Sequence, residues 1–181
     1  MSEEIINRFL CENDILDNKL HNAKHLIKLF DDWKNSKKIF LSHSHFDIEL
    51  VKSLKLLFNN LDIKLYIDWL DTSMPEKPNK ITALKIKQEI EISDHVFVLA
   101  TKNAMKSKWV PWEIGIADLS KSNDGITVIP ILADDKRFYG YEYLELYNHI
   151  EFEVLQNQLL VFNTDKTKMM LLENWLMDKF L

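Results

Sequence analysis

Glycine is scarce in this sequence, and its scarcity excludes two common ways of binding nucleotides. The chain has 3 glycines among 181 residues, at positions 115, 125 and 140. A G-x-G-x-x-G turn or a P-loop needs several glycines close together, because its backbone must approach phosphates closely. These three glycines are too widely spaced to build either motif. Dinucleotide-fold and NTPase chemistry are therefore not expected. Any nucleotide must be bound by a site that lacks a glycine-rich phosphate loop.

Other absences indicate where the protein acts and what it does not bind. Cys11 is the single cysteine, so a disulfide framework is excluded, and the start MSEEIINRFL is acidic where a secretion signal would be basic. The longest apolar run, around ITVIPILA, is far shorter than the ~20 residues that span a bilayer. The net charge of −5 comes from interleaved signs without a basic stripe. We expect a cytoplasmic protein that contacts neither membrane nor nucleic acid.

The hydrophobic pattern of the sequence changes its period near Lys37. With 46% hydrophobic residues, a chain of 181 residues is long enough for one well-packed domain and an extension. Residues 1–36 carry apolar side chains at helical spacing and are predicted to form a helical N-terminal extension. Residues 37–181 are predicted to form the main domain.

The main domain alternates short apolar strands with amphipathic helices. Strands are predicted at residues 39–42, 63–68, 95–100 and 126–131, with a helix after each of the first three. Beyond Leu132 the pattern weakens and predicts a turn of helix at EYLELY, an edge strand near 158–162 and a closing helix over about 167–180.

This alternation is typical of an α/β fold with a parallel sheet and helices on both faces. Ligands of such sheets bind beyond the C-terminal ends of the strands. The loops that begin at Ser42, Asp68 and Ala100 are therefore the candidate site.

The first of these loops, SHSHFD, contains part of a zinc-binding pattern. His43, His45 and Asp47 match the first ligands of the H-x-H-x-D-H signature of metallo-β-lactamase-like hydrolases, because imidazoles two residues apart on a turn can converge on zinc. Ile48 stands where that signature has its closing histidine. The favoured interpretation is loop histidines without a metal, and a zinc hydrolase is the less favoured alternative.

The second loop opens with Asp68 and Trp69 and contains Pro75 and Pro78. A tryptophan at a strand end more often belongs to the core or its rim than to a ligand site. Its place at the C-terminal edge of the predicted sheet, ahead of a loop stiffened by prolines, nevertheless makes this pair a candidate for ligand binding.

The third loop leads into SKWVPWEIGIAD, residues 107–118. Pro111 is tolerated only in the first turn of a helix, so the helix must begin near it. Glu113 then lies near the positive end of the helix dipole and shares a face with Trp109. Trp112 is expected in the core, with Gly115 letting the helix approach the sheet. On spacing alone, Glu113 is as readily a helix-start carboxylate as a catalytic one.

In order and spacing, these segments resemble a bacterial TIR (Toll/interleukin-1 receptor) domain. The similar segments are IFLSHSHFD, YIDW with its proline-bearing loop, SDHVFVLAT, SKWVPWEIGIAD and ITVIPIL, within residues 37–132. The resemblance implies a flavodoxin-like fold in which Glu113 is the catalytic carboxylate. It also implies that substrate is bound by Ser42, His43, Phe46, Asp68, Trp69 and Trp109.

The resemblance to NAD-cleaving, anti-phage members of the family also implies an activity. It implies an NAD+ glycohydrolase or cyclase that makes an ADP-ribose-type signal, linear or cyclic, for a separate effector protein in bacterial anti-phage immunity. NAD+ would be the substrate, with no cofactor and no metal. Self-association through residues 68–80, called the BB loop in this family, and a phage-derived trigger are further expectations. The alternative is a non-catalytic TIR module for protein–protein interaction, in which Glu113 only caps a helix.

Overall fold

The structure is a computed structural model that describes residues 37–61, 63–132, 140, 142–153 and 158–178. Residues from Lys38 onward form one compact unit. The helical extension predicted for residues 1–36 lies outside the described residues and stays a prediction. No helix in the described ranges has the length and apolar character needed to cross a membrane.

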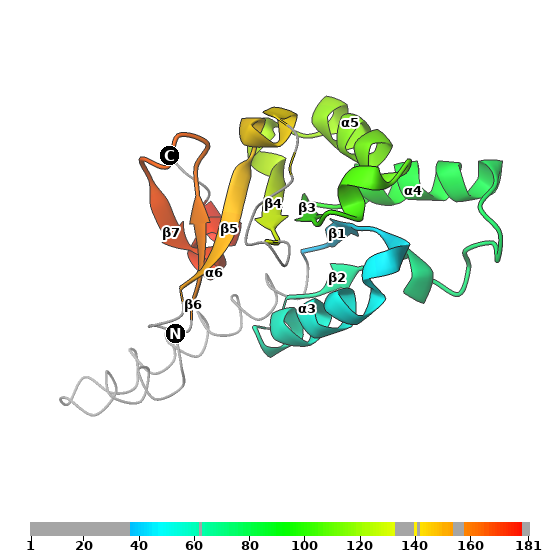
Figure 1. Cartoon of the computed structure of the whole chain (residues 1–181), viewed down its shortest axis with the longest axis horizontal. Helices are drawn as coiled ribbons and strands as arrows, with labels where there is room; N and C mark the ends of the chain where they lie inside the picture. The colour runs from blue at the N-terminus through cyan, green and yellow to red at the C-terminus, as the bar shows by residue number, and fades with distance from the viewer. Residues whose placement is uncertain (1–36, 62, 133–139, 141, 154–157, 179–181) are drawn as a thin grey trace, which may run out of the picture. The chain divides into compact units, whose positions relative to one another are not determined.

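In the described part of the chain, seven strands form one sheet in the spatial order β2-β1-β3-β4-β5-β6-β7 (Figure 1). The strands are β1 (Ile39–Ser42), β2 (Leu65–Tyr66), β3 (His95–Ala100), β4 (Ile126–Pro130), β5 (Asn148–Glu153), β6 (Gln158–Phe162) and β7 (Met169–Leu171). The five strands from β2 to β5 run parallel, whereas β6 and β7 pair antiparallel. The order 2-1-3-4-5 is that of flavodoxin-like folds, so the predicted α/β fold class is confirmed.

Helices cover both faces of this sheet. The α-helices of the described residues are α3 (Ile48–Asn60), α4 (Lys80–Ile92), α5 (Val110–Ser120) and α6 (Leu172–Asp178). Figure 1 shows α3 on one side of the parallel strands and α4 and α5 on the other. Neighbouring strand residues point to opposite faces. Phe97 of β3 accordingly meets Phe58 of α3, with ring centroids 5.6 Å apart, while Val98 packs in the same cluster as Ile114 of α5.

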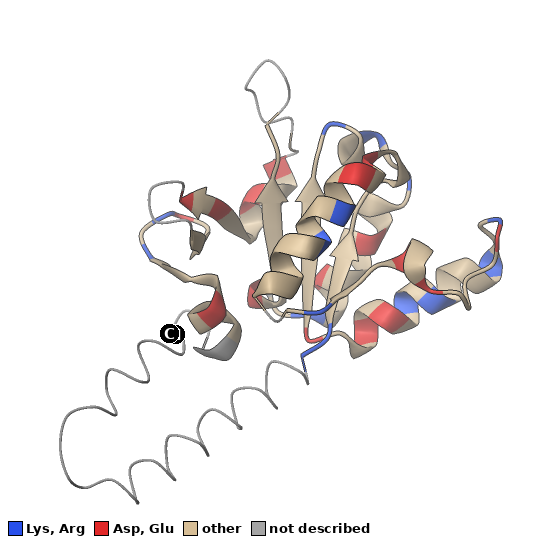
Figure 2. Ribbon diagram, turned by 90° about the horizontal axis from the view of Figure 1, so that it is seen from below, with Lys and Arg blue, Asp and Glu red and all other residues tan. Residues whose placement is uncertain are grey.

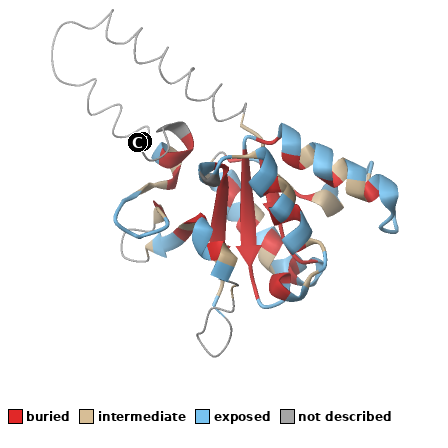
Figure 3. Cartoon of the chain, turned by 90° about the horizontal axis from the view of Figure 1, so that it is seen from above, coloured by how far each residue is buried: buried red, intermediate tan, exposed pale blue. Residues whose placement is uncertain are grey.

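The central strands are buried on both faces, as Figure 3 shows. Every residue of β1 and β3 is buried, and so are the first four of β4. Strands covered on both sides need apolar residues at every position rather than at alternate ones. This explains why IFLS, HVFVLA and ITVIP read as continuous apolar runs.

The C-terminal third departs from the prediction in three ways. Strand β5 was not predicted, because only one of its faces carries apolar residues and its sequence NHIEFE has the polarity of a loop. The predicted edge strand at 158–162 is β6, which is interior and pairs with β5 and β7. The closing helix was predicted from residue 167, but residues 169–171 form the edge strand β7 and helix α6 begins at Leu172.

Charged side chains are dispersed over the described surface. Figure 2 shows acidic and basic residues interspersed along the helices. Several of these charges pair locally, as Lys52 does with Glu49 and Lys87 with Glu91. Such exposed pairs contribute little to stability, and their mixed signs form no stripe that would follow a phosphate backbone.

Candidate active site

The candidate site lies at the C-terminal edge of the parallel strands, where three loops leave the sheet. The loop after β1 begins at His43, the loop after β2 contains Asp68, and the loop after β3 leads to α5. Because β1 lies between β2 and β3, these loops are neighbours in space although they are far apart in the sequence. Edges of this kind are where open α/β sheets bind ligands.

Glu113 enters the site from the first turn of α5. The helix begins at Val110 with Pro111 in its first turn, as predicted, and the Glu113 N–H donates to the Trp109 carbonyl at 2.8 Å. The Glu113 side chain points inward, and the residue is only 4% exposed. Its Oε2 accepts a hydrogen bond of 2.5 Å from the Oγ of Ser42, the last residue of β1. Within the described residues, no basic side chain pairs with this carboxyl.

Burial sets the protonation of this carboxyl. The pKa of Glu113 is raised from its ordinary value near 4.5 to about 8, chiefly by desolvation and to a lesser degree by the nearby charge of Asp68. The hydrogen bond from Ser42 acts in the opposite direction because it stabilises the carboxylate. Without a ligand, Glu113 is therefore largely protonated at pH 7. A cation bound beside it would restore the carboxylate.

His43 lies next to this pair, at the start of the loop after β1. Its Nδ1 is 2.9 Å from the carbonyl oxygen of Leu41, and its Nε2 is 3.6 Å from Oδ1 of Asp68. Burial lowers the pKa of His43 by more than the contact with Leu41 and the charge of Asp68 raise it. The ring is therefore neutral near pH 7, and its Nε2 faces the carboxylate of Asp68.

Asp47 is not placed as a metal ligand, although the partial zinc-binding pattern in the sequence included it. Its Oδ2 accepts from the Thr101 hydroxyl at 2.5 Å, and its Oδ1 accepts from the Asn103 amide at 2.7 Å. These bonds tie the loop after β1 to the loop after β3 and hold both around the site. Sequence reasoning missed Thr101 and Asn103, because nothing in their spacing marks them as partners of Asp47.

Three predicted substrate-binding residues are aromatic, and they lie in different environments. Phe46 is 88% exposed. Trp69 is partly buried in the short helix Asp68–Leu70, and its backbone N–H donates to the Asp68 side chain at 2.8 Å. Trp109 is partly buried and packs edge-on against Trp112, with ring centroids 5.4 Å apart. The structure thus brings Ser42 against Glu113, and His43 against Asp68, while Phe46 stands out from the surface.

Two expectations for α5 were wrong. Trp112, expected in the core, is 40% exposed, because the buried face of the helix is formed by Val110, Ile114 and Ala117. Gly115 was expected to let the helix approach the sheet. A Cβ atom at Gly115 would meet nothing within 4 Å, so no close approach requires this glycine.

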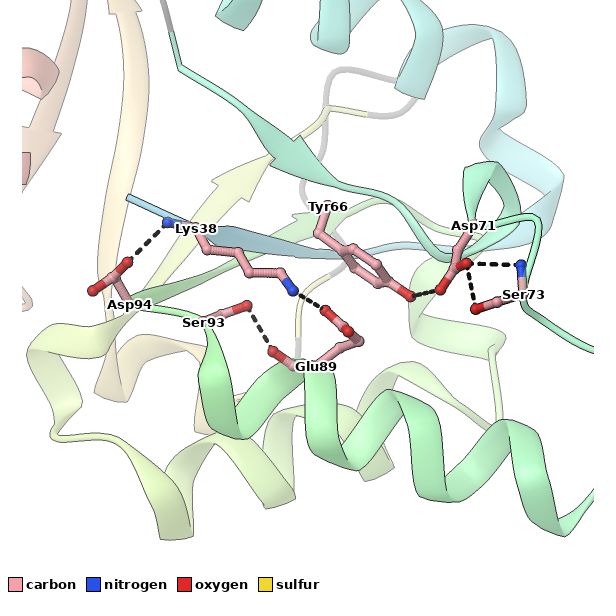
Figure 4. Close-up of polar contacts among 7 residues, drawn as sticks. All are labelled: Lys38, Tyr66, Asp71, Ser73, Glu89, Ser93 and Asp94. Atoms are coloured by element: carbon pink, nitrogen blue, oxygen red, sulfur yellow. Dashed lines mark hydrogen bonds and ion pairs between the residues drawn. The ribbon is translucent and has the colours of Figure 1, made fainter. Parts of the chain in front are cut away.

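Polar contacts anchor the first part of the loop 68–80. Figure 4 shows Tyr66 of β2 reaching Asp71, whose Oδ2 accepts from the phenol at 2.9 Å. Oδ1 of Asp71 accepts from the N–H and the hydroxyl of Ser73, at 2.8 and 2.6 Å. Lys85 of α4 donates to the Ser73 carbonyl.

The second half of the loop ends in a helix cap. Asn79 caps α4 by accepting from the Ile81 and Thr82 N–H groups, and the Thr82 hydroxyl accepts from the Asn79 N–H in return. The loop is therefore held at both ends. Between Ser73 and Asn79 the tip residues Glu76, Lys77 and Pro78 are exposed.

Comparison with known protein families identifies the class of this chain. Residues 39–160 match the profile of the TIR domain, and the chain belongs to that family. The resemblance to a bacterial TIR domain inferred from the sequence is confirmed.

Two relatives carry provisional names as cyclic ADP-D-ribose synthases. One, from Bacillus cereus (strain MSX-D12), is named probable 3' cyclic ADP-D-ribose synthase ThsB'; it is 29% identical over 160 residues, which are 77% of this chain and 81% of that protein. The other, TIR2 from Cytobacillus dafuensis, is 33% identical over 79 residues, which are 42% of this chain and 21% of that protein.

A solved structure supports the fold. The crystal structure of a prokaryotic SEFIR domain superposes with a TM-score of 0.50 at 12% sequence identity, covering 67% of this chain and 90% of that one. At this level of identity the likeness shows the fold alone.

Proposed function

We propose that this protein is an enzyme that cleaves the bond between nicotinamide and ribose in NAD+. The observation that carries the proposal is the buried carboxyl of Glu113, held by Ser42 beside Asp68 without a basic partner among the described residues. Burying a carboxyl costs free energy, and perturbed carboxyls at a sheet edge are typical of functional sites. Two acidic groups at one site favour a cationic ligand, and the nicotinamide ring of NAD+ is cationic.

The reaction suits a single carboxylate. When the glycosidic bond breaks, its electron pair moves to the ring nitrogen and nicotinamide leaves as a neutral molecule, so no general acid is needed. The ribose left behind acquires positive charge at C1, as in glycoside hydrolysis. In the proposal, ionised Glu113 hydrogen-bonds the ribose hydroxyls and stabilises this charge in a site that excludes water. Ser42 positions the carboxylate.

The remaining residues of the proposed site bind the substrate. Asp68 contributes negative charge that favours the nicotinamide cation. Trp69 and Trp109 offer aromatic surfaces for stacking on nicotinamide or adenine. His43 and Phe46 border the site from the loop after β1.

The names of the two relatives support a cyclic product. Attack on C1 by a hydroxyl of the adenosine ribose forms a new C–O bond, releases a proton and gives cyclic ADP-ribose. Attack by water instead gives linear ADP-ribose. We propose that the cyclic product predominates and signals to a separate effector protein in cytoplasmic anti-phage defence.

Incubating the purified chain with NAD+ and separating the products by chromatography with mass detection tests the proposal. The expected products are nicotinamide and an equal amount of ADP-ribose that lacks one water molecule. Release of ADP-ribose with its full mass would support hydrolysis instead of cyclisation. If no nicotinamide appears at any protein concentration, the result contradicts the proposal and favours the alternative, a TIR interaction module.

A further inference from the structure

His43, His45 and Asp68 converge at the edge of the proposed active site. His43 directly follows β1, His45 begins the short helix His45–Asp47, and Asp68 lies in the loop after β2. Their potential ligand atoms all lie within 4.8 Å of one another. Asp68, not Asp47, therefore completes a set of two imidazoles and one carboxylate. The partial sequence pattern pointed to the histidines but to the wrong acid.

The orientation of His43 prepares its Nε2 atom to bind a cation. A carbonyl oxygen can only accept, so the contact of Nδ1 with the Leu41 carbonyl places the ring proton on Nδ1. In the neutral ring, Nε2 then carries a lone pair. Metal-bound histidines usually make this same contact through their other nitrogen, because it fixes the tautomer and the orientation of the ring.

The surroundings of Nε2 leave this lone pair without a donor. The His43 side chain is only 3% exposed, and among the described residues Nε2 has no hydrogen-bond partner. It faces Oδ1 of Asp68 at 3.6 Å, and a carboxylate oxygen also offers only lone pairs. Two lone pairs facing each other in a buried place are unfavourable, and a shared cation would turn the repulsion into two bonds.

The donor set and its spacing select the class of cation. Imidazole nitrogens with one carboxylate suit transition ions such as Zn2+, whereas Mg2+ and Ca2+ prefer oxygen ligands. In a tetrahedral zinc site, bond lengths of about 2.0–2.1 Å put neighbouring ligand atoms about 3.3 Å apart. The separation of 3.6 Å between His43 and Asp68 is close to this value. His45 is exposed, so its side chain can rotate to close the remaining gap and give the ion a path from solvent.

We propose that His43, His45 and Asp68 bind one divalent transition-metal ion, with Zn2+ as the best match, and that the bound ion inhibits the enzyme. Metal binding is inferred from the positions of the three side chains. Inhibition, in contrast, rests on the proposed NAD+-cleaving function. Asp68 is close enough to Glu113 for its charge to act on that carboxyl, so an ion held by Asp68 lies in the same site. Its charge would repel the cationic nicotinamide ring. The ion is thus an inhibitor and not a cofactor.

Calorimetric titration of ZnCl2 into chelator-treated protein without a metal-binding tag tests the binding half. One Zn2+ per chain is expected, with MgCl2 giving no heat of binding. His45→Gln and, separately, Asp68→Asn should weaken Zn2+ binding by at least about tenfold. The matched control is His149→Gln, since His149 lies far along the sheet on β5 and pairs with Glu151. Wild-type protein that binds no Zn2+, or a folded His45→Gln variant that binds as tightly as wild type, would overturn the site.

The inhibition half is tested by nicotinamide release with and without ZnCl2. Zn2+ should slow the wild-type reaction, EDTA should restore it, and His45→Gln should be active and much less sensitive to Zn2+. Zn2+ that binds without slowing the reaction, or activity that EDTA abolishes, would overturn inhibition. If wild type releases no nicotinamide at all, the proposed function and inhibition both fail, and the calorimetry still decides whether the site exists.

Discussion

The Oγ atom of Ser42 lies 2.5 Å from Oε2 of Glu113, although the two residues are 71 positions apart in the sequence. The bond joins the last residue of β1 to the first turn of α5. A hydroxyl donates a stronger hydrogen bond to a carboxylate than to a neutral carboxyl group. Ser42 therefore both fixes the position of Glu113 and favours its ionised form.

Replacing Ser42 by alanine should lower kcat by about 10- to 100-fold with a smaller change in KM, because the carboxylate loses the donor that positions it. The same change should move the pH profile of the reaction upward, since the bond from Ser42 lowers the pKa of Glu113. Ser44, buried in the same loop, provides a control as Ser44→Ala. A folded Ser42→Ala variant with the pH profile of wild type would show that Ser42 does not act through Glu113.

The wild-type reaction should depend on pH in a defined direction. Burial raises the pKa of Glu113 to about 8, and the ionised form is the active one, so kcat/KM should rise with pH and level off above about 8. The cationic ring of bound NAD+ favours the carboxylate, so kcat should titrate at lower pH than kcat/KM. Initial rates between pH 5.5 and 9.5 check both statements. A kcat/KM that is flat over this range would contradict the assignment of Glu113.

The same carboxyl should make the protein less stable at high pH. The unfolded chain loses the Glu113 proton near pH 4.5, whereas the folded chain keeps it until about pH 8. Between these values the folded state binds more protons, so its stability falls as pH rises, by up to about 5 kcal/mol for this group. Glu113→Gln removes this loss. Urea unfolding should show the variant gaining stability over wild type from pH 5 to pH 8.5, and an equal difference at both pH values would be inconsistent with a buried, protonated Glu113.

Strands β1, β3 and β4 could be predicted because they are buried on both faces, so their sequences are continuous apolar runs. Strands β5 and β7 could not, since β5 alternates polar with apolar residues and β7 has only three residues. Pro111 indicated where α5 begins, and that start determines where Glu113 lies. The partners of Asp47 and the link from His43 to Asp68 depend on how three loops pack, which residue spacing does not encode.

Self-association through the BB loop remains a proposal, and the exposed loop tip offers a way to test it. If neighbouring chains complete each other's sites, the rate should rise more than in proportion to enzyme concentration, and Lys77→Glu at the tip should abolish that rise. Lys64→Glu is the matched control, because Lys64 is also exposed but precedes β2, at the opposite end of this strand from the loop. Light scattering should detect larger species only in the wild type and the control. Strictly proportional rates from a monomer would rule out shared sites.

Nicotinamide release from NAD+ by Glu113→Gln tests directly whether this carboxyl is catalytic. The substitution keeps the shape of the side chain and removes its ability to ionise, and the matched Glu91→Gln makes the same chemical change on the exposed side of α4. We expect Glu113→Gln to be folded and at least about 100-fold slower than wild type, while Glu91→Gln keeps the wild-type rate. A folded Glu113→Gln protein with wild-type turnover would contradict the central claim.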